Sequence, residues 1–253
     1  MTLQPYLQRA FDQGRVLKII SGLTNFETAH VLAIAKAAQQ GGATFIDMAA
    51  EASLVQQVRQ QVSLPICVSA VEAEQFLAPV AAGADLVEIG NFDAFYAQGL
   101  RFDAEDVLSL TQQTRELLPH IALSVTVPHI LALDEQVQLA EALVAAGADI
   151  IQTEGGTSSQ PAHAGTLGLI EKAAPTLAAA HAISNAIQVP VLCASGLSAV
   201  TVPLAIAAGA AGVGVGSAVN KLNDEVAMVA AVRGLAEALQ TVTRSSMTAP
   251  APQ

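Results

Sequence analysis

Basic residues are scarce in this sequence. Its 253 residues include 11 Lys and Arg against 22 Asp and Glu, so the formal net charge at pH 7 is −11. Nucleic acids and anionic membrane surfaces repel a chain of this charge, and neither is expected as a partner. An anionic ligand must then be held locally, by backbone N–H groups and the positive end of a helix dipole.

Cysteine is also rare. Cys67 and Cys193 lie in apolar segments and lack the spacing of a metal site, a pattern typical of buried free thiols in a reducing compartment. Residues 1–15 lack the apolar core of a signal peptide. We therefore expect a cytoplasmic protein.

Residues 173–220 contain no charged side chain, which raises the question of a membrane span. The best candidate span, residues 197–219, is interrupted by Pro203 and several glycines, so it would form a poor helix in lipid. Parallel strands buried on both faces and covered by Ala-rich helices explain the run better. We expect no membrane span.

One short sequence motif recurs along the chain and predicts its fold. We call this motif the repeated phrase. It reads GGATFIDMA, AGADLVEIG, AGADIIQTE and AGAAGVGVG, at residues 41–49, 82–90, 146–154 and 208–216. Each copy follows an Ala-rich helical stretch, so its glycine is expected to end a helix and turn the chain into a strand. These glycines are Gly42, Gly83, Gly147 and Gly209.

Four further apolar segments complete the count of strands. They lie at residues 16–20, 65–69, 121–127 and 189–195. Eight strands separated by helices predict a single (β/α)8 TIM barrel over residues 1–244, followed by a disordered tail at residues 245–253. A doubly wound open sheet is the alternative, but the segment after the first strand lacks the G-x-G-x-x-G dinucleotide motif.

Two Gly/Ser turns follow the last two strands. In TIM barrels a phosphate site is frequently built from these loops and a short extra helix, for which residues 218–222 are the candidate. Glycines that merely permit tight turns are the simpler interpretation, but two such turns at the end of the repeat favour phosphate binding. The predicted backbone donors are those of Gly196, Leu197, Gly216 and Ser217.

The loop at residues 153–165 is long and rich in Gly and Ser. It fits a lid, or further anion contacts through Gly155 and Gly156, about as well as it fits a plain surface loop.

Titratable side chains are predicted to meet at the barrel mouth. Alignment of the repeated phrase puts Asp47, Glu88 and Gln152 at one level, with Glu154 on the same face. These carboxylates are candidates for proton transfer, which we favour over a metal site. His129, at a strand end, is a further acid/base candidate.

Lys18 is the strongest catalytic candidate because it lies inside a predicted strand, where a cation is costly unless it pairs with an anion or has a function. It could serve as a Schiff-base amine, a general acid or a carbonyl polariser. A purely structural pair with a carboxylate is the alternative.

Six runs resemble one known family. They read KIISGLTNF, ICVSAV, EIGNFDAFY, LSVTVPH, IQTEGGTSS and ASGLSAVTVP, at residues 18–26, 66–71, 88–96, 123–129, 151–159 and 194–203. They resemble the hypothetical chloroplast reading frame twenty-three family of cyanobacteria and algal plastids. The resemblance implies a TIM barrel in the cyanobacterial cytosol or the plastid stroma, and it carries no established reaction.

More widely, the Gly196 and Gly216 turns are similar to those of thiamine phosphate synthase, ribulose-phosphate epimerase and flavin-dependent nitronate-oxidising enzymes. Lys18 is similar to the imine-forming lysine of furfuryl-phosphate-forming synthases. The His/Asp metal set of the epimerases is missing, since this chain has Asp47 and Ala49 on the second strand.

The leading hypothesis is an enzyme acting on a small phosphorylated metabolite, either a lyase, an aldolase-like synthase or an isomerase, with no cofactor required. An FMN-binding oxidoreductase is the second hypothesis, and a non-catalytic binding or regulatory barrel in photosynthetic cells is the third. A homo-oligomer is compatible with each.

Overall fold

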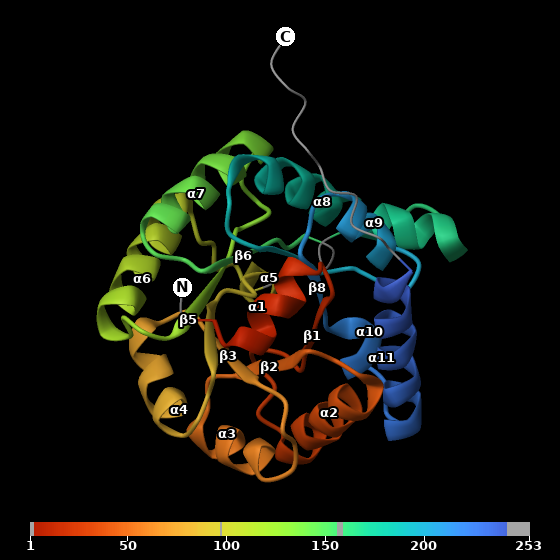
Figure 1. Cartoon of the computed structure of the whole chain (residues 1–253). Helices are drawn as coiled ribbons and strands as arrows, with labels where there is room; N and C mark the ends of the chain where they lie inside the picture. The colour runs from red at the N-terminus through yellow and green to blue at the C-terminus, as the bar shows by residue number, and fades with distance from the viewer. Residues whose placement is uncertain (1–2, 97, 156–158, 242–253) are drawn as a thin grey trace.

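Eight parallel strands close into a barrel, each beside its neighbour in the sequence, with the last strand paired to the first (Figure 1). The computed structural model describes residues 3–96, 98–155 and 159–241. The strands are β1 (Val16–Ile20), β2 (Phe45–Ala49), β3 (Ile66–Ala70), β4 (Leu86–Ile89), β5 (Ala122–Thr126), β6 (Ile150–Gln152), β7 (Val191–Ala194) and β8 (Gly212–Val215). Closure confirms the predicted TIM barrel and excludes the open sheet. The predicted tail, residues 245–253, lies outside the described residues.

Helices alternate with the strands and surround the barrel (Figure 1). The outer elements are α2 (Thr28–Gly41), α3 (Ala52–Arg59), the 3₁₀ turn η1 (Ala73–Phe76), α4 (Leu77–Ala81), α6 (Ala104–Leu117), α7 (Leu133–Ala145), α8 (Gly165–Ala186), α9 (Val202–Ala207) and α11 (Glu225–Gln240). Three further helices are α1 (Pro5–Asp12), α5 (Asp93–Tyr96) and α10 (Ser217–Asn220). Within the described ranges, none of the helices has the length and apolar character needed to cross a membrane.

The repeated phrase turns helices into strands as predicted. Gly42, Gly83, Gly147 and Gly209 follow the ends of α2, α4, α7 and α9 with φ of 88°, 108°, 102° and 104°. Only glycine enters this left-handed region without strain, which explains its place in every copy.

Two copies of the phrase carry an aspartate that clamps the strand before it. Asp149 Oδ2 accepts the N–H of Leu123, at 3.0 Å, and pairs with Arg115, at 2.9 Å. In the preceding copy Asp85 accepts the N–H of Ile66 and pairs with Arg59. These clamps fix the start of one strand against the next.

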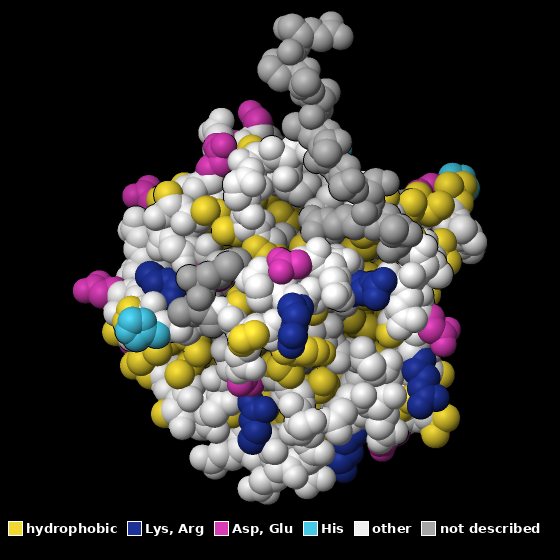
Figure 2. All heavy atoms as spheres, viewed as in Figure 1, with side chains coloured by type: hydrophobic (Ala, Val, Ile, Leu, Met, Phe, Trp, Pro, Cys, Tyr) yellow, Lys and Arg dark blue, Asp and Glu magenta, His cyan; other side chains and the backbone are white. Residues whose placement is uncertain are grey.

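The interior of the barrel is apolar at one end and polar toward the other. Leu7 and Phe11 of α1 pack with inward side chains from the strand starts, including Phe45 and Cys67, so α1 covers this end (Figure 1). Figure 2 shows the same face, where Lys and Arg side chains lie singly rather than in one patch. The carboxyl ends of the strands lie at the opposite end, where barrel sites are found.

Close packing of α2 against α11 yields a first prediction. A Cβ added at Gly41 would lie 2.4 Å from the Cβ of Val232, whereas one at Gly234 meets nothing within 4 Å. We expect Gly41→Ala to lower the free energy of unfolding by about 1–3 kcal/mol through overpacking. Gly234→Ala should raise it by about 0.5–1 kcal/mol, because alanine is the better helix former. Urea denaturation of both variants checks this; equal effects of one sign would contradict the packing.

Candidate functional site

A fully buried ion cluster lies inside the barrel. Lys18 Nζ is 2.6 Å from Glu88 Oε1 and 3.6 Å from Asp47 Oδ2, and the three side chains are at most 1% exposed. Lys18 also donates to Gln152 Oε1 at 3.0 Å. Asp47, Glu88 and Gln152, which the sequence alignment put at one level, therefore surround one lysine. The side chain of this lysine points into the barrel, as expected.

Neighbouring strands satisfy the remaining atoms of these carboxylates. Ser69 donates to Asp47 Oδ1 at 2.6 Å, and Ser124 donates to Glu88 Oε2 at 2.7 Å. Gln152 Nε2 donates to Glu88 Oε1 at 2.7 Å and to Thr126 at 3.1 Å. A buried polar network is stable only when its members are bonded in this way.

Asn91, just beyond β4, covers this cluster. Its Nδ2 donates to Ser69 Oγ and Glu88 Oε1, both at 3.2 Å, and to Asp47 Oδ2 at 3.5 Å. Its φ of 62° is unusual for a residue with a side chain. The backbone at this point is therefore held in a strained form that directs the amide toward the buried carboxylates.

The charges of the cluster shift the pKa values of its members. Burial alone lowers the pKa of Lys18, but the charges of Asp47 and Glu88 outweigh it, so the pKa is raised and the side chain is an ammonium. Burial raises the pKa of Asp47 to about 6, although Lys18 opposes this. An ammonium is not a nucleophile, so this arrangement favours an electrostatic or structural role of Lys18 over an imine.

A second titratable cluster lies at the barrel mouth. Glu154 Oε1 accepts hydrogen bonds from Tyr96 Oη at 2.6 Å and from the backbone N–H of His129 at 3.2 Å, and the Nδ1 of His129 lies 3.2 Å away. Asp93 Oδ1 lies 3.3 Å from the same ring nitrogen. Ser195 donates to Asp93 Oδ2 at 3.2 Å.

The pKa values of two residues in the mouth cluster are raised. Burial raises the pKa of Glu154, against the hydrogen bonds from His129 and Tyr96. Burial lowers the pKa of His129, but the hydrogen bond to Glu154 and the charges of Glu154 and Asp93 together outweigh burial, so the pKa is raised. Ligand atoms of Asp93, His129 and Glu154 lie within 4.8 Å of one another, so a cation there would have to displace their mutual hydrogen bonds.

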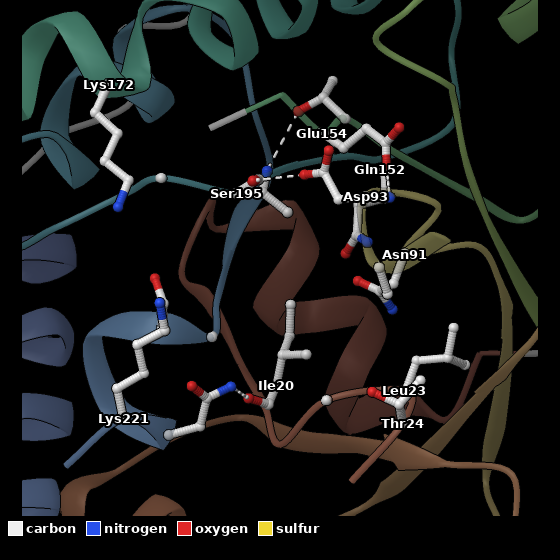
Figure 3. A pocket seen from close by; sticks show the side chains of 18 residues that line it. Ile20, Leu23, Thr24, Asn91, Asp93, Gln152, Glu154, Lys172, Ser195 and Lys221 are labelled. Atoms are coloured by element: carbon white, nitrogen blue, oxygen red, sulfur yellow. Dashed lines mark hydrogen bonds between the residues drawn. The ribbon is translucent and has the colours of Figure 1, made fainter. Parts of the chain in front are cut away.

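A pocket of about 290 Å³ opens between this cluster and the ends of β1, β7 and β8 (Figure 3). Glu154, Asp93, Gln152 and Asn91 lie on one side of it (Figure 3). Lys172 of α8 and Lys221, after α10, extend toward each other on the other side (Figure 3). Gly196, Gly216 and Ser217 also line the pocket.

The two pocket lysines lack a carboxylate of their own. Among the described residues neither Lys172 nor Lys221 forms an ion pair within 4.0 Å. Two like charges directed at one place in an acidic protein make it attractive to an anion.

The structure places the predicted site residues in three groups. Glu154, Gly196, Gly216 and Ser217 line the pocket. Lys18, Asp47 and Glu88 lie below its floor, and His129 stands behind Glu154. Leu197 and Gly155 are buried and do not line it, while Gly156 lies outside the described residues.

The short helix after β8 begins earlier than predicted. It spans Ser217–Asn220 rather than residues 218–222, because Val219 and Asn220 already donate their N–H groups to Gly216 O, at 2.9 Å. Asn220 also donates to Ile20 O at 3.1 Å, which ties α10 to the end of β1.

Sequence reasoning missed Asp93, Tyr96 and the two pocket lysines. Asp93 and Tyr96 lie close to aromatic residues that pack on one another, since the ring centroids of Phe92 and Phe102 are 4.6 Å apart. Lys221 carried a usable signal, because it lies four residues after Ser217, about one helical turn along.

Fold and site together define a TIM barrel with a polar pocket at the carboxyl ends of its strands. The chain belongs to the family described as "Protein of unknown function (DUF561)", whose profile matches residues 3–245. "Uncharacterized protein ycf23" of Cyanophora paradoxa is 48% identical over 218 residues, covering 86% of this chain and 89% of the relative. The protein of the same name from Pyropia yezoensis is 37% identical over 229 residues, covering 90% and 84%. The predicted family resemblance is confirmed.

Solved structures share the fold at low identity. "Wild-type GGGPS from Thermoplasma volcanium" has a TM-score of 0.67 at 12% identity, covering 96% of this chain and 99% of that one. 3-Hexulose-6-phosphate synthase has a TM-score of 0.62 at 18% identity, covering 88% and 99%. Thiamine phosphate pyrophosphorylase from Pyrococcus furiosus has 0.59 at 20%, covering 90% and 97%.

Removal of the Lys18 charge should destabilise the protein, because the carboxylate partners of Lys18 are buried. Lys18→Met leaves Glu88 and Asp47 without their cation, and we expect a loss of about 3–5 kcal/mol in the free energy of unfolding at pH 8. The loss should be smaller at pH 5, because the carboxylates then take up protons. Urea denaturation at both pH values measures it. A small loss with no dependence on pH would contradict the ion cluster.

His129 should titrate above its usual pKa of 6.5, because its hydrogen bond to Glu154 favours the charged ring. NMR titration of the imidazole measures this value. Glu154→Gln should lower it, whereas Glu237→Gln, on exposed α11 surface, should leave it unchanged. A His129 pKa that does not respond to Glu154→Gln would rule out the contact.

Proposed function

We propose that this protein is an enzyme that acts on a small phosphorylated metabolite, bound in the pocket at the mouth of the barrel. The observation that carries the proposal is the pair of lysines without carboxylate partners, Lys172 and Lys221, on the side of the pocket that Gly196 and Gly216 also line. A phosphate supplies the negative charge that these lysines lack.

The glycine turns suit a phosphate because they let it approach the backbone. Gly216 is followed by the first residues of α10, whose N–H groups have no acceptor within the helix. Lys172 and Lys221 add charge-assisted hydrogen bonds to these backbone donors. The proposed phosphate-binding group is therefore Gly196, Gly216, Ser217, Lys172 and Lys221. Leu197 and Gly155 do not line the pocket and are left out of this group, and Gly156 lies outside the described residues.

Glu154 is the proposed acid/base, since it lines the pocket opposite the lysines. Its raised pKa brings the carboxyl closer to neutral pH, where it can accept a proton from the substrate and return it. His129 and Tyr96 hold its orientation from behind. Lyase, aldolase-like synthase and isomerase reactions all need such a proton transfer.

Lys18 takes part in this proposal as a cation below the pocket floor. Its charge holds Glu88 and Gln152, and Gln152 lines the pocket. The proposed role of Lys18, Asp47 and Glu88 is to position the floor amides and to set the local potential, rather than to form an imine.

Titration with inorganic phosphate tests the binding site. Lys172→Ala and Lys221→Ala should each weaken the affinity about tenfold, because each removes a charge-assisted contact. Lys36→Ala, on α2 and away from the pocket, is the matched control. Calorimetry at fixed ionic strength measures the affinities, and equal binding by all three variants and the wild type would refute the site.

Gly216→Asp offers an independent test of the same site. An added Cβ there would lie 3.5 Å from Asn220 Nδ2 and 3.6 Å from Ile20 atoms, which is ordinary contact, so the variant should fold. Its carboxylate should abolish phosphate binding by repulsion.

The two alternative functions predict different outcomes: a flavoprotein would bind FMN and absorb visible light, and a non-catalytic barrel would bind a metabolite without converting it.

A further inference from the structure

We propose that the pocket selects phosphate monoesters whose far end carries hydroxyl groups and rejects those that end in a carboxylate. This inference rests on the proposed function, because it takes the phosphate to lie beside Lys172 and Lys221. It adds the chemical class of the rest of the substrate, a short polyol or sugar phosphate rather than a phosphorylated acid.

The first support is the separation of charge across the pocket. Both lysines lie on one side, while Glu154 and Asp93 lie on the other with Asn91 and Gln152 (Figure 3). We call these last four residues the acceptor wall. A ligand that places its phosphate against the lysines directs its other end at the acceptor wall, where two carboxylates repel a second anion.

The second support is that the amide donors of the acceptor wall are already engaged. Gln152 Nε2 donates to Glu88 and Thr126, which uses both of its N–H groups. Asn91 Nδ2 is directed at the oxygens of Ser69, Glu88 and Asp47. A ligand carboxylate therefore meets neither a cation nor a free amide donor at this wall, and its desolvation stays uncompensated.

The third support is that one carboxylate oxygen of Glu154, Oε2, can accept a further hydrogen bond. Glu154 Oε1 already has three partners, which are Tyr96 Oη, the backbone N–H of His129 and the ring Nδ1 of His129. Among the described residues, its Oε2 accepts only the N–H of Asp93, at 3.3 Å. A carboxylate oxygen accepts about two hydrogen bonds, so Oε2 has capacity for a ligand hydroxyl.

The size of the pocket limits the ligand. Its volume of about 290 Å³ lies at the lower end of the range for small-molecule sites. A phosphate on a chain of a few carbons fits this volume, so the hydroxyl-bearing carbon and the phosphate are close neighbours in the molecule.

Glycerol 3-phosphate and 3-phosphoglycerate make a matched pair of probes, because they differ in a hydroxymethyl group against a carboxylate. Calorimetry of the full chain at pH 7.5 should show glycerol 3-phosphate binding at least about tenfold more tightly. Glu154→Gln should narrow this ratio severalfold, since the amide removes the repelling charge and offers a donor. Inorganic phosphate should bind that variant at the wild-type affinity or more tightly, because a negative charge has left the pocket, and this binding verifies that the pocket is folded.

The outcomes separate the two proposals. Equal affinity for the two probes, or tighter binding of 3-phosphoglycerate, would overturn the selectivity and leave the phosphate site in place. A discrimination unchanged by Glu154→Gln, with phosphate binding intact, would overturn the role of Glu154. Failure of the wild type to bind either probe or inorganic phosphate would overturn the proposed function together with the inference.

Discussion

One buried ammonium group, that of Lys18, holds the inside of the barrel together. Two carboxylates and an amide from three other strands point at it, and all of them are buried. Without this cation, two buried acidic side chains would be left without a positive charge, which a protein avoids by protonation or unfolding. Gln152 and Asn91 depend on the same cluster for their orientation, so the pocket floor does too.

Charge placement reconciles an acidic protein with an anionic ligand. The chain carries 22 acidic residues, and yet Lys172 and Lys221 both line the pocket without a carboxylate partner among the described residues. The carboxylates of the mouth are instead tied to His129, Tyr96 and Ser195, across the pocket. The lysines attract an anion to one side of the pocket, and Glu154 provides a proton acceptor on the other side.

Sequence periodicity predicted the barrel and the alignment of the side chains around Lys18, because both follow from short-range rules. It placed these side chains at the open mouth of the barrel, whereas the structure buries Lys18, Asp47 and Glu88 below the pocket. The repeated Gly-Ala phrase fixes the phase of each even strand, and a period of two then aligns Asp47, Glu88 and Gln152. The pocket lysines and Asp93 could not be placed this way, since their positions depend on the path of α8 and of the loops after β4 and β8. Leu197 is buried and does not line the pocket, so the predicted contact of its backbone N–H with a phosphate stays a prediction.

A crystal structure of the protein with glycerol 3-phosphate tests the central claim, that the pocket binds a phosphorylated ligand in one direction. We expect the phosphate at Gly216 and Ser217, within reach of Lys172 and Lys221, and a ligand hydroxyl on Glu154 Oε2. A ligand bound in the reverse direction, or at another place on the molecule, would contradict it.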